Sequence, residues 1–158
     1  MEKNGMLWTP KKLYVGGPIV GTHYDASTSW REEVRQAMPE GIVVISPMRA
    51  KEHLAGGNVT LDRLVGHAVT SNSGVVSRDR FDVASCDAIL VNLLGATKVS
   101  LGSSVELGWA DMLRKPVIVV MEAEGNPHDH PMLRGLADFL VPTLEEGIQA
   151  AIHVLVQW

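Results

Sequence analysis

The sequence predicts an α/β fold, a flavodoxin-like or Rossmann-like doubly wound sheet of about five parallel strands in a single domain over residues 1–158. Short apolar runs alternate with amphipathic stretches, which is the pattern of strands and their covering helices. Residues 88–93 form a nearly continuous apolar run, as a strand covered on both faces requires. The 158 residues are 46% hydrophobic and 20% charged, which is typical of one soluble globular domain.

The expected elements alternate in order along the chain. The predicted strands are residues 13–15, 42–45, 88–93, 116–121 and 139–141. The predicted helices begin at a capping box over Ser29-Trp30-Arg31-Glu32 and at caps Ser77, Ser103 and Thr143. The first of them ends near Pro39, the second at Cys86 and the third near Arg114. Residues 48–76 carry a weaker pattern, so we expect a long irregular loop with a functional role.

Composition excludes several classes of function. The 14 Lys and Arg against 18 Asp and Glu give a net charge of −4 without a basic run, which argues against binding a nucleic acid polymer. The longest apolar stretches, such as residues 116–121, are far below the ~20 residues of a membrane helix. Residues 1–10 have no apolar signal core, so we expect a cytoplasmic protein without a membrane partner.

Neither a metal nor a cofactor is expected. Cys86 is the single cysteine, which excludes a disulfide within the chain and a cysteine-based zinc site and predicts an inert core thiol. The pair in His128-Asp129-His130 lacks further ligand spacing, so these histidines are expected in solvent. The loop from Gly16 to Gly21 matches neither the dinucleotide fingerprint nor the phosphate-binding P-loop, which disfavours nicotinamide and ATP chemistry.

Ligands of open α/β sheets bind beyond the carboxyl ends of the strands, and only some polar residues reach that crevice. Glu106 follows Ser103 by three residues, and that spacing alone favours a capping-box glutamate. The alternative is a carboxylate kept ionised near a helix N-terminus, which suits a nucleophile. Asp79 and Asp82 are explained by the helix dipole or by acid-base work beside Glu106. Paired carboxylates of this kind can cleave a glycosidic bond.

Three segments together resemble the nucleoside 2-deoxyribosyltransferase family, including the related 2-deoxynucleoside 5-monophosphate N-hydrolases. They are Leu13-Tyr14-Val15-Gly16-Gly17-Pro18, then Arg78-Asp79 eight residues before the segment 86–93, and residues 100–110. The last segment is similar to the family signature Gly-x-x-x-Glu-Leu-Gly-Tyr-Ala, with Trp109 in the aromatic position.

The resemblance implies a role for each matching residue. Glu106 would attack C1 of the deoxyribose and form a glycosyl-enzyme ester, which an incoming base or water resolves with retention. Tyr14 would orient that carboxylate, and Asp79 would exchange a proton with the nucleobase. The resemblance also implies a set of substrate-binding residues, namely Gly16, Gly17, Pro18, Asp82, Asn92, Ser100, Gly102, His130 and Met132.

Departures from the transferase pattern concern the 5-end of the sugar. Ser100 stands where transferases often have an acid for the free 5-hydroxyl, and the monophosphate hydrolases have a serine there. The resemblance also places His130 and Met132 where the family reaches a neighbouring subunit's site. It therefore implies a homodimer or higher homo-oligomer with composite active sites.

Three hypotheses follow, of which the first is deoxyribosyl transfer from a 2-deoxynucleoside to another nucleobase. The second is hydrolysis of a nucleoside or deoxynucleoside monophosphate through the same glutamyl intermediate. The third is a nucleotide sensor without catalysis, against which the presence of Tyr14, Asp79 and Glu106 argues. All three have a small-molecule nucleoside or nucleotide as ligand.

Overall fold

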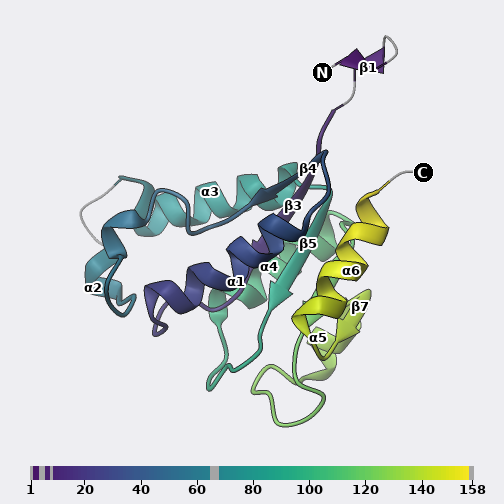
Figure 1. Cartoon of the computed structure of the whole chain (residues 1–158). Coiled ribbons are helices and arrows are strands. Elements are labelled where there is room, and N and C mark those ends of the chain that lie inside the picture. The colour runs from purple at the N-terminus through teal and green to yellow at the C-terminus, as the bar shows by residue number, and fades with distance from the viewer. Residues whose placement is uncertain (1, 4–5, 8, 65–67, 157–158) are drawn as a thin grey trace.

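A five-stranded parallel sheet forms the centre of the molecule. The computed structural model describes residues 2–3, 6–7, 9–64 and 68–156. The sheet strands are β3 (Lys11–Gly16), β4 (Ile42–Ile45), β5 (Ala88–Asn92), β6 (Val117–Val120) and β7 (Phe139–Val141). Their spatial order is β4-β3-β5-β6-β7 with every neighbouring pair parallel (Figure 1). This order is flavodoxin-like, which confirms the predicted fold class.

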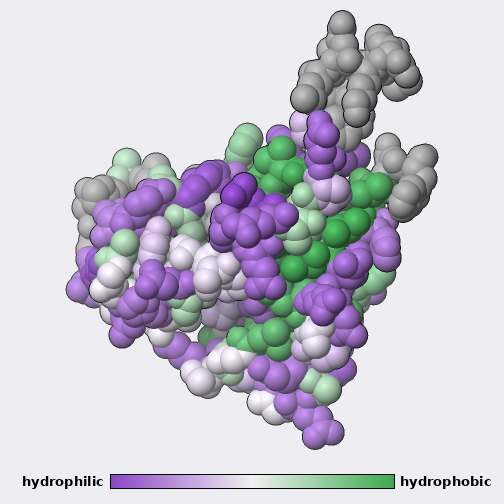
Figure 2. All heavy atoms as spheres, in the orientation of Figure 1, coloured by the Kyte–Doolittle hydropathy of each residue, from purple (hydrophilic) through white to green (hydrophobic). Residues whose placement is uncertain are grey.

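Two layers of helices cover the sheet. On one face α1 (Tyr24–Ala37) and α6 (Leu144–Leu155) pack against residues such as Leu13, Leu90 and Ile118. On the other face lie α3 (Asn72–Ser85), α4 (Leu101–Met112) and α5 (Pro131–Leu136). Figure 2 shows hydrophobic atoms gathered between α1 and α6, whereas the outer surfaces of these helices are hydrophilic. All side chains of β6 are buried, as a strand covered on both faces requires.

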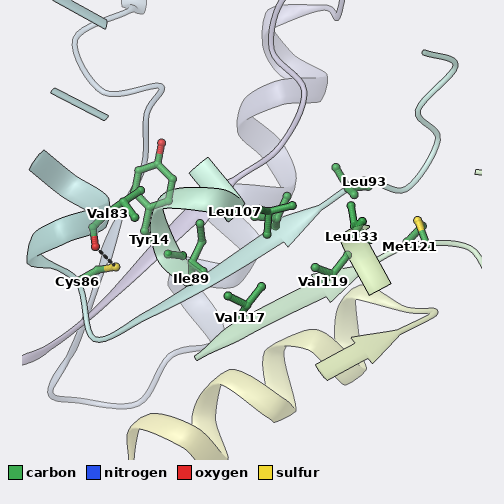
Figure 3. Close-up of a cluster of buried hydrophobic side chains, with 12 residues drawn as sticks. Tyr14, Val83, Cys86, Ile89, Leu93, Leu107, Val117, Val119, Met121 and Leu133 are labelled. Atoms are coloured by element: carbon green, nitrogen blue, oxygen red, sulfur yellow. Dashed lines mark hydrogen bonds between the residues drawn. The ribbon is translucent and has the colours of Figure 1, made fainter. Parts of the chain in front are cut away.

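The core beneath α3, α4 and α5 includes one tyrosine. Figure 3 shows Tyr14 beside aliphatic residues such as Ile89, with its hydroxyl pointing away from them. Tyr14 is fully buried, and a buried hydroxyl requires a hydrogen-bond partner. Cys86 lies in the same cluster, 1% exposed, with its thiol directed at the Val83 carbonyl oxygen, and burial raises its pKa to about 11. The expectation of an inert core thiol is therefore confirmed.

Three helices begin earlier than the sequence predicts. α1 begins at Tyr24 with His23 as its cap, so the capping box at Ser29 is wrong, because that serine lies inside the helix. α3 begins at Asn72, where the Ser71 side chain accepts from the Gly74 amide, and not at Ser77. α4 begins at Leu101, where the Ser100 hydroxyl oxygen accepts from the Ser103 amide. Thr143 does cap α6, as predicted.

The segment 48–76 is more ordered than expected. It contains the turns η1 (Glu52–Leu54) and η2 (Ala68–Thr70), the short α2 (Leu61–Leu64) and the first turn of α3. Its elements are too short to leave a hydrophobic period in the sequence, which explains why it reads as a loop. The short α5 was also unpredicted, although its cap His130 is followed by the typical Pro131.

A small antiparallel pair, β1 (Glu2–Lys3) with β2 (Met6–Leu7), precedes the sheet. Within the described ranges no helix has the length and apolar character needed to cross a membrane.

Candidate active site

A cavity of about 390 Å³ opens at the carboxyl ends of the strands. It is lined by the loop after β3, by residues of the 48–76 segment, by α3 and by the first turns of α4. The lining residues are Gly17, Pro18, Ile19, Val20, Lys51, Leu61, Leu64, Val75, Asp79, Lys98, Val99, Ser100, Leu101, Gly102, Ser103 and Glu106. Six of them were predicted to bind substrate or to act in catalysis, namely Gly17, Pro18, Asp79, Ser100, Gly102 and Glu106.

Glu106 is directed into this cavity and does not cap its own helix. Because α4 begins at Leu101, Glu106 stands beyond the first turn, and the capping interpretation is wrong. The Tyr14 hydroxyl donates to Glu106 Oε1 over 2.8 Å, in a buried hydrogen bond. Glu106 is only 7% exposed, and burial raises its pKa to about 7, although the bond from Tyr14 opposes this shift. The carboxylate is therefore held in one orientation and titrates near neutral pH.

The two glycines after β3 allow the backbone to approach this carboxylate. A Cβ atom on Gly16 would lie 2.7 Å from Glu106 Oε2. A Cβ atom on Gly17 would lie 2.7 Å from the Asn92 carbonyl oxygen. Both distances are shorter than real contacts, so only glycine fits at either position without displacement of its neighbours.

Arg31 holds the same loop through hydrogen bonds to its backbone. It is 3% exposed, and its guanidinium donates to the carbonyl oxygens of Val15, Gly17 and Ser27. It also stacks on Trp30, 4.3 Å from the ring centroid. Its charge lowers the pKa of Glu106, so it helps to keep that carboxylate ionised. The sequence analysis missed Arg31.

Asp79 provides the second carboxyl group of the cavity. It lies within α3, 6% exposed, with Oδ1 at 3.5 Å from the Arg78 Nε atom. No hydrogen bond to Asp79 Oδ1 is formed by any residue in the described part of the chain. Burial raises the pKa of Asp79, while the charges of Lys51 and Arg78 oppose the shift. A carboxyl group that is buried and without a donor is suited to carry a proton and to exchange it with a ligand.

Lys51 is a cavity residue that the sequence analysis missed. It is 2% exposed, and burial lowers its pKa to about 8, against the opposing attraction of Asp79 and Glu106. It comes from the 48–76 segment, next to Ala50, and no motif or period marks it in the sequence. Its position depends on Arg78, which donates to the carbonyl oxygens of Pro47 and Arg49 and ties this segment to α3.

The first turn of α4 is held by an internal network. The Ser100 amide donates to His128 Nε2 over 2.8 Å, and His128 Nδ1 lies 3.0 Å from Asn126 Oδ1. Since Nε2 accepts, Nδ1 must carry the proton and donate to Asn126. His128 is 3% exposed, so the expectation that it lies in solvent is wrong. Ser100 and Lys98 then form the end of the cavity beside the α4 N-terminus.

Five predicted substrate-binding residues do not line the cavity, and Gly16 is one of them. Asp82 is buried and paired with the Arg49 guanidinium at 2.6 Å. The Asn92 side chain accepts from the Leu94 amide. His130 Nδ1 accepts from the Met132 amide at the start of α5, and Met132 is 70% exposed. Tyr14 and Gly16 are also absent from the lining, yet both contact Glu106.

Solved structures of several α/β proteins resemble this arrangement. A 2-desoxiribosyltransferase from Leishmania mexicana has a TM-score of 0.61 at 18% identity, covering 91% of this chain and 98% of that chain. The CMP N-glycosidase BcmB from Clostridium botulinum has a TM-score of 0.56 at 17% identity, covering 89% and 98%. The DNA processing protein A from Helicobacter pylori has a TM-score of 0.58 at 15% identity, covering 94% and 83%. At these identities the likeness shows the fold alone.

The sequence was also compared with models of protein families, and this comparison identifies the class of protein. The model of nucleoside 2-deoxyribosyltransferase matches residues 13–143, which include both carboxylates of the cavity. The chain therefore belongs to the nucleoside 2-deoxyribosyltransferase family. No curated protein matches the chain in sequence.

Proposed function

We propose that this protein cleaves the N-glycosidic bond of a 2-deoxynucleoside 5-monophosphate, with Glu106 as the nucleophile. The observation that carries the proposal is the buried Glu106 carboxylate, oriented by Tyr14 and facing a cavity that it shares with Asp79. In retaining glycosidases, one carboxylate attacks the anomeric carbon while a second group handles the proton of the leaving group. Glu106 and Asp79 match these two roles in burial and placement.

In the proposed reaction Glu106 attacks C1 of the sugar, and the C1–N bond breaks with its electron pair going to the base. Asp79, as the protonated carboxyl, gives its proton to the base and makes it a better leaving group. Water then attacks C1 of the glycosyl ester, gives its proton to Asp79 and releases Glu106 with retention. The Tyr14 hydrogen bond fixes which carboxylate oxygen faces the sugar.

The 5-end of the cavity favours a phosphate over a free hydroxyl. Lys98, the Ser100 hydroxyl and the amides at the start of α4 line that end, and the helix dipole favours an anion there. Among the described lining residues, the acids are Asp79 and Glu106 alone, so no carboxylate stands ready at the 5-end to repel a phosphate. This lining supports monophosphate hydrolysis more than transfer from a nucleoside, which was the leading hypothesis from the sequence. Transfer to a second base remains the other candidate, because the matching family model is that of a transferase.

The test is a comparison of substrates with and without an acceptor base. We expect base release from deoxynucleoside 5-monophosphates, slower release from the free nucleosides, and no exchange when a second base is added. Exchange of bases on a free nucleoside would support the transferase candidate instead. After reaction with a 2-fluoro-2-deoxy analogue, which slows ester breakdown, mass spectrometry is expected to find the sugar phosphate on Glu106.

Glu106→Gln is expected to lose at least about 1000-fold of the activity, because the covalent route disappears. Glu145→Gln, on the exposed surface of α6, is the matched control and retains full activity. Base release by folded Glu106→Gln at the wild-type rate would contradict the proposal and favour a mechanism without this nucleophile.

We also propose a homo-oligomer of this chain. A groove between α3 and α4 has an apolar lining in which Phe81 is 69% exposed and Met112 81% exposed, next to Trp109. Contiguous exposed apolar surface of this kind is typical of a protein interface. Light scattering is expected to give a mass of at least two chains, and a monomeric mass would contradict the proposal.

A further inference from the structure

Lys51 is a buried cation without a partner. It lines the cavity at 2% exposure, and in the described part of the chain its ammonium forms neither a hydrogen bond nor an ion pair within 4.0 Å. A buried ammonium with unsatisfied donors is unfavourable unless a ligand or water supplies acceptors. The cavity is the side from which such an acceptor can come.

The backbone holds Lys51 at this position at some cost. The preceding residue, Ala50, has φ of 60°, a left-handed conformation that a residue with a side chain rarely adopts. Arg78 closes the segment by donating to the Arg49 carbonyl oxygen over 3.0 Å and to the Pro47 carbonyl oxygen over 2.7 Å. Strained residues persist where the surrounding contacts fix them, and they gather at ligand sites.

Asp79 is a charged group of the same cavity, and its charge raises the pKa of Lys51 against the effect of burial. Its Oδ1 atom is buried 3.5 Å from the Arg78 Nε atom without a hydrogen bond from the described residues, and the Asp79 side chain lines the same cavity. In the proposed reaction Asp79 donates a proton to a ring nitrogen of the base. Lys51 has donors only, so the two groups together offer hydrogen bonds to two neighbouring acceptors on the edge of a ligand.

We propose that Lys51 recognises the nucleobase, by donating to a carbonyl oxygen next to the ring nitrogen that Asp79 protonates. This inference rests on the proposed function and names its substrate class, which is nucleotides of oxo bases. A 6-oxopurine presents N7 and O6 as adjacent acceptors, whereas adenine presents N7 beside an amino donor. Against adenine, the ammonium and the amino group would both stay unpaired.

The test uses two substrates that differ at this edge, 2-deoxyinosine and 2-deoxyadenosine 5-monophosphate. We expect the wild-type protein to favour the oxo substrate in kcat/KM by about 10-fold or more, since a buried donor rejects a ligand without its acceptor. Lys51→Met keeps the length of the side chain and removes the donors. It is expected to lose about 10-fold on deoxyinosine monophosphate and little on deoxyadenosine monophosphate, so the preference disappears.

Lys98→Met is the matched control, because Lys98 is a lysine at the phosphate end of the same cavity. It is expected to lower activity on both substrates equally. If Lys51→Met keeps the wild-type ratio of kcat/KM between the two substrates, the inference is wrong. Lys51 would then be a residue that only influences the charge of Asp79.

Binding of free bases gives an independent readout. By calorimetry, the wild-type protein is expected to bind hypoxanthine more tightly than adenine, and Lys51→Met to lose that difference. If the wild-type protein cleaves neither nucleotide, the proposed function fails, whereas a hypoxanthine preference that depends on Lys51 would still support base recognition. Equal binding of the two bases by the wild-type protein would overturn the inference.

Discussion

Two sides of the cavity, called walls below, differ in whether the protein itself supplies hydrogen-bond partners for their polar groups. The α4 wall consists of Ser100 and Glu106. There the protein itself supplies the hydrogen-bond partners, since Tyr14 donates to Glu106 and His128 accepts from the Ser100 amide. The α3 wall consists of Asp79 and of Lys51 from the 48–76 segment. There the Lys51 ammonium has no hydrogen-bond partner among the described residues, and Asp79 Oδ1 has only the Arg78 Nε atom at 3.5 Å. The first wall is complete before a ligand arrives, which suits a nucleophile that must keep one orientation. The second wall becomes complete only around a ligand, which suits recognition of the base and proton exchange.

Asp79→Asn tests the incomplete wall, and Asp82→Asn is its matched control one helical turn away. We expect Asp79→Asn to lower kcat/KM by about 10²–10⁴, because an amide cannot supply the proton. Asp82 faces Arg49, so Asp82→Asn is expected to lower the thermal midpoint and to change kcat/KM by less than about 10-fold. Steady-state kinetics on both variants, with folding checked by circular dichroism, measures the difference. Equal losses of activity would show that Asp82 also serves the base, as the family resemblance implied.

Tyr14→Phe tests the complete wall. The tyrosine hydrogen bond lowers the pKa of Glu106, which burial raises to about 7, and the nucleophile must be ionised to attack. Activity is therefore expected to rise with pH through about 7 in the wild-type protein, and Tyr14→Phe is expected to shift this rise to higher pH. At pH 7 we expect a loss of about 10–100-fold, the usual value of a hydrogen bond to a charged group. If kcat/KM of the variant rises over the same pH range as that of the wild-type protein, this role of Tyr14 is wrong.

His128 gives the smallest expected effect, on stability. Burial lowers its pKa below 6.5, and its neutral form accepts from the Ser100 amide. A histidine whose folded pKa is depressed contributes stability above its unfolded pKa and loses it as the pH falls below that value. We therefore expect the free energy of unfolding to fall below pH 6.5 in the wild-type protein, and to fall less in His128→Gln, which does not titrate. Urea denaturation across this range measures it, with His153→Gln on α6 as a control that keeps the wild-type slope.

The residues of the complete wall could mostly be located from the sequence, although His128 was wrongly expected in solvent and the roles of Tyr14 and Glu106 came from the family resemblance. Tyr14, Gly16 and Gly17 follow or end an apolar strand, and Ser100 and Glu106 flank a helix start, so strand ends and caps locate them. The sheet order follows from the same alternation of strands and helices. The position of the α4 start was wrong by a few residues, and this error produced the capping interpretation of Glu106.

The incomplete wall could only partly be predicted. Asp79 was a candidate from its place near an expected helix start, and the family resemblance supplied its role. Lys51 comes from short turns that produce no hydrophobic periodicity in the sequence. Arg31 did leave a signal, since Ser27, Arg31 and Val34 share one buried face of α1 at spacings of four and three. A charged residue is almost never fully buried unless it is paired, so an arginine on the inward face of a helix indicates specific partners. Contacts between distant segments, such as Arg78 with Pro47, have no local pattern at all.

The absence of a side chain at Gly16 fixes where the nucleophile can rest. Glu106 Oε2 lies so close to Gly16 that a Cβ atom on residue 16 would be 2.7 Å from it. Gly16→Ala would push the carboxylate off the end of β3 and turn it from the tyrosine hydroxyl. The smallest possible enlargement of the strand end would thus misalign the attacking oxygen while leaving every titratable group in place.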